Sequence, residues 1–69
     1  MTNNVMEILK ADKKANAMLT KFENAAEAVN MIGEEYREAR KTMISLIIAC
    51  TPAAMTAMAN EIWEEVNAN

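Results

Sequence analysis

Apolar residues recur along most of the chain with the period of a helix. Between residues 15 and 50, sixteen positions follow a three-of-seven spacing, and all but Gly33 and Arg40 are apolar. Of the sixteen other positions between residues 15 and 42, only three are apolar, which predicts amphipathic helix throughout. We call the apolar set the first stripe: Ala15, Met18, Leu19, Phe22, Ala25, Ala26, Val29, Ile32, Tyr36, Ala39, Met43, Leu46, Ile47 and Cys50.

A second helix is predicted to begin at Pro52. Proline suits the first helical position, threonine is a good cap, and the residue before a proline avoids helical geometry. One helix therefore ends near Cys50, and another runs over residues 52–66. The residues before Thr51 are apolar nearly all round, so this turn should be buried on several sides. The last helix carries a stripe of its own, formed by Met55, Met58, Ala59, Ile62 and Val66.

The short connection at Thr51 predicts that the last helix packs antiparallel against the preceding one. Met58 and Trp63 are expected to anchor it, and Val66 is expected to reach Tyr36. The last helix has three glutamates and no basic residue. In this register its glutamates arrive near basic residues of the preceding helix, Arg37 and Lys41.

Gly33, the single glycine, allows two interpretations. Glycine commonly follows a helix end, which gives three helices over residues 4–32, 34–50 and 52–66 in a monomeric bundle. Alternatively, one long helix spans residues 4–50, unbroken or kinked at Gly33. The sequence favours the long helix, because the first stripe keeps its phase across Gly33 and no proline, serine or aspartate lies nearby to build a turn. Arg40 either pairs with a glutamate across the stripe or extends past Ile62 into solvent.

A long helix would leave residues 4–32 without a partner in their own chain. The exposed apolar face would exceed what single soluble chains usually tolerate, so we expect a homodimer through the long helices. The predicted fold class is an all-α dimeric helical bundle formed by a single domain over residues 1–69. The residues expected to mediate self-association are Leu19, Phe22, Val29 and Ile32.

Length and composition narrow the setting of the protein. A chain of 69 residues buries a small core, and with one cysteine and no histidine it has neither a disulfide nor a histidine-containing zinc site to stabilise it. The unpaired Cys50, expected to be a buried and inert thiol, suits a reducing compartment, so we expect a cytoplasmic protein. The longest near-apolar run, residues 43–50, is far shorter than a membrane span, and we expect no membrane association.

Residues suited to catalysis or metal binding are scarce. Glu34 and Glu38 share a helix face, but carboxylate metal sites in helical bundles add histidine, and a solvated face is the better interpretation. Cys50 lacks a histidine base. One glycine cannot form a glycine-rich phosphate loop. We therefore expect no enzyme activity and no cofactor.

The remaining function class is an adaptor, inhibitor or regulator that binds another protein through helical faces. Small size without active-site motifs is typical of accessory proteins of phages and mobile elements. Met31 lies off the first stripe among polar residues, and adaptable methionines are common on binding surfaces. The expected partner-facing residues are Met31, Glu34, Glu35 and Glu38.

The alternative function is a dimeric regulator that binds nucleic acid. Residues 1–24 carry a net charge of +1, whereas residues 25–69 carry −4. The basic residues that would contact phosphates are Lys10, Lys13 and Lys14. Interleaved acidic residues and the overall charge of −3 weigh against this function.

Overall fold

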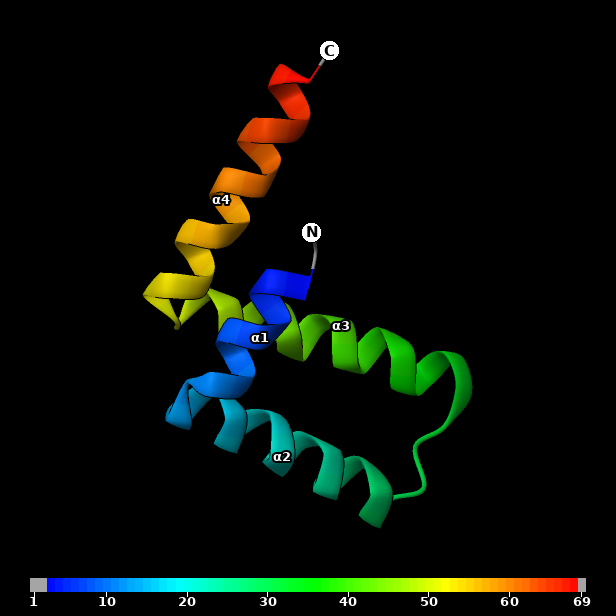
Figure 1. Cartoon of the computed structure of the whole chain (residues 1–69). Coiled ribbons are helices and arrows are strands. Elements are labelled where there is room, and N and C mark those ends of the chain that lie inside the picture. The colour runs from blue at the N-terminus through cyan, green and yellow to red at the C-terminus, as the bar shows by residue number, and fades with distance from the viewer. Residues whose placement is uncertain (1–2, 69) are drawn as a thin grey trace.

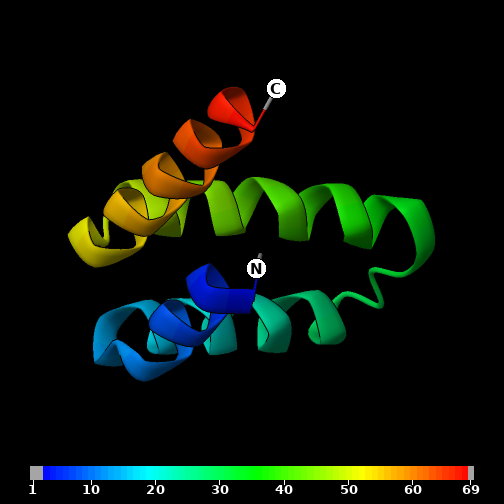
Figure 2. The same cartoon turned by 45° about the horizontal axis from the view of Figure 1, so that its top comes forward.

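The computed structural model describes residues 3–68, with side chains from Val5 onward. This part of the chain forms four helices and no strand: α1 (Asn3–Ala11), α2 (Lys13–Ala28), α3 (Gly33–Ala49) and α4 (Pro52–Asn67). The predicted all-α class is confirmed. Helices α2 and α3 form an antiparallel hairpin, and α1 and α4 pack near the end of this hairpin that is opposite its turn (Figures 1 and 2).

Asp12 separates α1 from α2. Its backbone is extended, with φ −80° and ψ 123°, and its carboxylate accepts a 2.9 Å hydrogen bond from the Ala15 N–H. Aspartate is among the best residues for this capping role, because its oxygen satisfies an N–H that the first helical turn leaves unpaired. The predicted unbroken helix is therefore wrong at Asp12.

The predicted long helix is also wrong at residues 29–32, where the chain reverses between α2 and α3. Asn30 adopts the left-handed conformation with φ 57°. The Met31 N–H donates to the Ala26 oxygen at 2.9 Å, and the Asn30 N–H donates to the Glu27 oxygen at 3.1 Å. This pair of bonds is a Schellman motif, which satisfies the last carbonyls of α2. Asparagine tolerates the left-handed region, so Asn30 ends α2, and Gly33, with φ 67°, begins α3.

The predicted boundary at Thr51–Pro52 is confirmed, but the predicted antiparallel packing is wrong. Helices α3 and α4 are bent by 106° relative to one another. The Thr51 hydroxyl caps no N–H of α4 and instead donates to the Ile47 oxygen at 2.7 Å. Because the two helices diverge, Val66 is 66% exposed and does not cover Tyr36. In the described residues the glutamates of α4 form no ion pair with Arg37 or Lys41.

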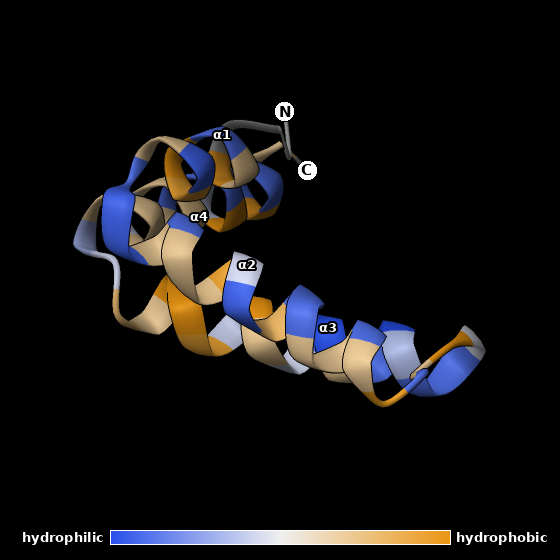
Figure 3. Cartoon of the chain, turned by 90° about the horizontal axis from the view of Figure 1, so that it is seen from below, coloured by the Kyte–Doolittle hydropathy of each residue, from blue (hydrophilic) through white to orange (hydrophobic). Residues whose placement is uncertain are grey.

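The core lies where α1 and α4 meet the α2–α3 hairpin, and apolar residues concentrate there in Figure 3. Leu9 and Ile47 are its largest fully buried side chains. Small residues lie at the close approaches, since Ala15 and Ala54 are almost completely buried. Val5 and Leu19 complete the core, and further residues pack against it: Met6, Ile8, Met43, Ile44, Ile48, Ala57 and Met58.

Within residues 3–68, no individual helix has both the length and the apolar character of a membrane span. Helices α3 and α4 reach that combination only when they are taken together, across their 106° bend.

Candidate protein-binding surface

Part of the apolar side of the α2–α3 hairpin is covered within the chain. Leu19 is buried in the core, and the half-buried Phe22 ring stacks on Tyr36 with the ring centroids 5.9 Å apart. Arg40 Nε lies 3.5 Å from the Glu23 carboxylate of the facing helix, as the first of the two interpretations of Arg40 predicted. Leu19 and Phe22 therefore need no second chain to cover them.

Val29 and Ile32, the other two residues predicted to mediate self-association, lie at the hairpin turn and are 67% and 79% exposed. Their exposure follows from the Schellman motif. Because the chain leaves the helix at residue 29, the side chains of Val29 and Ile32 no longer continue the helical face that packs against the facing helix. The turn appears as an apolar segment at the end of the hairpin in Figure 3.

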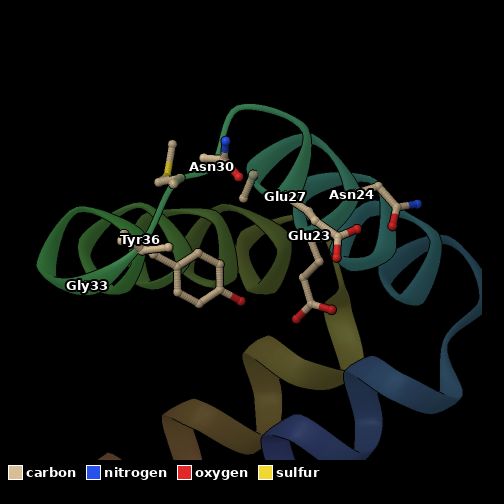
Figure 4. Close-up of a pocket in the computed structure, with 9 residues that line it drawn as sticks. Glu23, Asn24, Glu27, Asn30, Gly33 and Tyr36 are labelled. Atoms are coloured by element: carbon tan, nitrogen blue, oxygen red, sulfur yellow. The ribbon is translucent and has the colours of Figure 1, made fainter.

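An open hollow of about 620 Å³ lies beneath this turn, between α2 and α3. Figure 4 shows the Tyr36 ring and the Glu23 side chain extending into it from the two helices. The rest of its lining is polar and acidic at one edge and apolar at the other. The lining residues are Glu23, Asn24, Ala26, Glu27, Asn30, Met31, Ile32, Gly33 and Tyr36.

The predicted partner-facing residues surround the same turn, and the helix ends explain part of their presence. Met31 is half-buried and occupies the position at which a Schellman motif places an apolar residue over the last helical turn. Glu34 and Glu35 lie in the first turn of α3, where negative charge stabilises the helix dipole. Glu38 is exposed one turn later, and Glu34 pairs with Arg37 at 3.9 Å in solvent.

The predicted nucleic-acid contacts are also exposed. Lys10 is in the last turn of α1, and Lys13 and Lys14 begin α2, so all three lie at one corner of the molecule. Asp12 lies within this corner, as a cap, and lowers its net charge.

Cys50 and Trp63 also lie elsewhere than the sequence indicated. Cys50 is exposed rather than buried, because it caps the end of α3 where the chain turns away. Trp63 was expected to anchor α4 and is 69% exposed, whereas Met58 is half-buried against the core as expected. The described residues contain no group of three or more acidic or cysteine side chains arranged to hold a metal ion. The chain matches no protein-family model, no curated protein and no solved structure.

Proposed function

We propose that the chain is a non-enzymatic helical interaction protein that binds another protein through the α2–α3 turn. The turn surface comprises Val29, Met31, Ile32, Glu34, Glu35 and Glu38. The proposal is supported above all by Ile32, which directly precedes α3 with extended backbone angles (φ −138°, ψ 169°) and whose aliphatic side chain is 79% exposed. Val29, three residues earlier in the same connection, is 67% exposed as well, so two aliphatic side chains are left uncovered at the turn.

The charges near the turn indicate the chemistry of the partner. Residues 23–38 contain five glutamates and one arginine. Binding partners of such a surface combine apolar side chains, which cover Val29 and Ile32, with basic residues at the rim. A basic amphipathic segment of another protein has this composition, and the adaptor, inhibitor or regulator role follows from such binding.

Replacing Ile32 by serine separates binding from folding. Ile32 is 79% exposed, and Gly33 with φ 67° lies outside helical geometry, so serine gains no regular cap and we expect the free energy of unfolding to change by less than about 0.5 kcal/mol. Removal of the apolar contact should at the same time weaken partner binding by about tenfold or more. The measurements are urea denaturation and quantitative affinity capture from host extract with each variant as bait.

Leu46→Ser is the matched control, because Leu46 is also exposed but lies near the other end of α3. Proteins retained by the wild-type chain and by Leu46→Ser, but lost with Ile32→Ser, would support the turn surface. Equal retention by all three baits would contradict it.

The second candidate function is nucleic-acid binding, which the exposed corner of Lys10, Lys13 and Lys14 supports. Reversal of these three charges to glutamate would then abolish salt-dependent retention on DNA or RNA and leave protein capture intact. Cytoplasmic location and a homodimer stay predictions. Leu19 and Phe22, which the sequence assigned to the dimer interface, are covered within the chain, so a homodimer would use other residues.

A further inference from the structure

Helix α4 has two apolar faces, and the chain covers only one of them. The covered face packs into the core through Ala54, Ala57 and Met58. The uncovered face carries Met55, Ala59, Ile62 and Val66, with Trp63 beside them; we call these four residues the outer stripe. Helix α4 extends away from the other helices, with its C-terminal end farthest from them (Figure 1).

The sequence predicts that five residues of α4 pack against the preceding helix. Four of them form the outer stripe, and the fifth, Met58, lies on the covered face. Met55 is 51% exposed, Ile62 57% and Val66 66%, and Ala59 is exposed as well. Their successive spacings of four, three and four residues are those of the a and d positions in a coiled coil. This spacing places all four side chains in line, as a helical partner requires.

We propose that a second copy of the chain covers the outer stripe, with the two α4 helices antiparallel about a two-fold axis. In this register the facing residue numbers sum to 121. Ala59 then faces Ile62 of the second copy, and Met55 faces Val66 of the second copy. Each pair recurs on the other side of the axis, as a two-fold interface demands. The small Ala59 lets the larger Ile62 pack between the helices.

The charges of α4 favour the antiparallel arrangement over the parallel one. Glu61, Glu64 and Glu65 all lie in the C-terminal half, and residues 52–60 carry no charge. Antiparallel pairing places each acidic half against the uncharged half of the other helix, near the positive end of its dipole. Parallel pairing would instead bring the acidic C-terminal halves of the two helices together at one end of the interface, and their like charges would repel.

The charges also favour a second copy over a basic partner helix. Glu61 is half-buried towards the covered face, and Glu64 lies nearly opposite the outer stripe on the helix, which leaves Glu65 at one flank. Trp63 and the uncharged Asn60 and Thr56 lie on the other flank. A stripe bordered by so little charge offers few partners for basic side chains, and the equally uncharged stripe of a second copy matches it. Its length of two heptads places the interface at the small end, below about 1,200 Å² in total, so the dimer should depend on concentration.

Sedimentation equilibrium and the fluorescence of Trp63, the single tryptophan, test the proposal together. As the concentration rises towards about 1 mM, we expect a shift from monomer to dimer and a matching blue shift of Trp63 emission. Ala59→Asp should weaken dimerisation by about tenfold or more, because it introduces a charge into the stripe. Asn60→Asp is the matched control, since it adds the same charge one residue along the same helix but outside the stripe, and it should dimerise nearly as the wild type does.

Cross-linking tests the orientation. With Cys50 replaced by serine, a mixture of Met55→Cys and Val66→Cys chains should form the mixed disulfide, and Met55→Cys alone should form none. In the antiparallel register the two copies of residue 55 lie about 16 Å apart along the axis, whereas parallel helices would place them side by side. A wild-type chain that stays monomeric up to about 1 mM overturns the proposal. This holds even if the wild type captures a protein from extract that Ala59→Asp does not, because another protein would then cover the outer stripe. Equal weakening by Ala59→Asp and Asn60→Asp, or a Met55→Cys self-disulfide, overturns it too.

Discussion

Replacement of Leu9 by alanine should remove most of the stability of the fold. Leu9 is fully buried where α1 packs against α2 and α4, and it is one of the two largest fully buried side chains. Deleting a buried leucine side chain costs about 2–5 kcal/mol, because apolar contacts are lost and a cavity remains. A domain of this length has about 3–10 kcal/mol in total. Urea denaturation followed by circular dichroism at 222 nm measures the change.

Ile62→Ala is the control for this variant, since it removes a similar aliphatic side chain from the outer stripe of α4. Ile62 is more than half exposed, and alanine favours the helix, so the monomer should lose less than about 0.5 kcal/mol. The comparison is made at concentrations at which both chains are monomeric. A loss for Ile62→Ala as large as that for Leu9→Ala would show that the outer stripe is buried in the monomer.

Gly33→Ala should destabilise the protein by about 1–2 kcal/mol, although alanine is the better helix former. Gly33 has φ 67°, and a methyl group added there meets no atom within 4 Å. The whole cost is therefore backbone strain, since a side chain in the left-handed region crowds its own carbonyl. In a continuous helix the same substitution would stabilise the chain by about 1 kcal/mol. The sign of the change in urea denaturation thus distinguishes the hairpin from the long helix.

Asn30→Gly provides the complementary substitution at the other left-handed residue. Glycine adopts φ 57° without strain, so we expect stability equal to that of the wild type or slightly above it. In a continuous helix, glycine at position 30 would instead cost a few tenths of a kcal/mol or more relative to asparagine. A loss of stability with Gly33→Ala but none with Asn30→Gly would therefore support a turn built on Asn30 and Gly33, whereas the reverse pattern would support a continuous helix.

The helical class could be predicted from the three-of-seven period of apolar residues, and the Thr51–Pro52 boundary because proline restricts the backbone locally. The α2–α3 turn was missed because the first stripe keeps its phase across it. Phe22 and Tyr36 both belong to that stripe. They would lie on the same face of a straight helix, and in the hairpin they face one another, so their positions fit both arrangements. Asn30 carried the deciding local signal, since asparagine is the usual alternative to glycine after a helix end.

The packing of α4 could not be predicted, because both of its faces are apolar. The sequence favoured the face with the larger side chains, whereas the core uses the face with Ala54 and Ala57. Helices that cross at a steep angle approach closely only where side chains are small, and this preference depends on the tertiary arrangement. The exposure of Trp63 and Cys50 follows from the same arrangement, whereas the exposed glutamates of the turn surface could be predicted from their polar positions.

The chain folds back at residues 29–33, and this reversal covers part of its own first stripe. The nuclear Overhauser effect between the ring protons of Phe22 and Tyr36 tests it most directly, because the chain has one phenylalanine and one tyrosine. With labelled chain diluted into an excess of unlabelled chain, we predict a strong cross-peak within one molecule, since the ring centroids lie 5.9 Å apart. A continuous helix would separate the two residues by about 21 Å, and absence of that cross-peak in the folded protein would contradict the account.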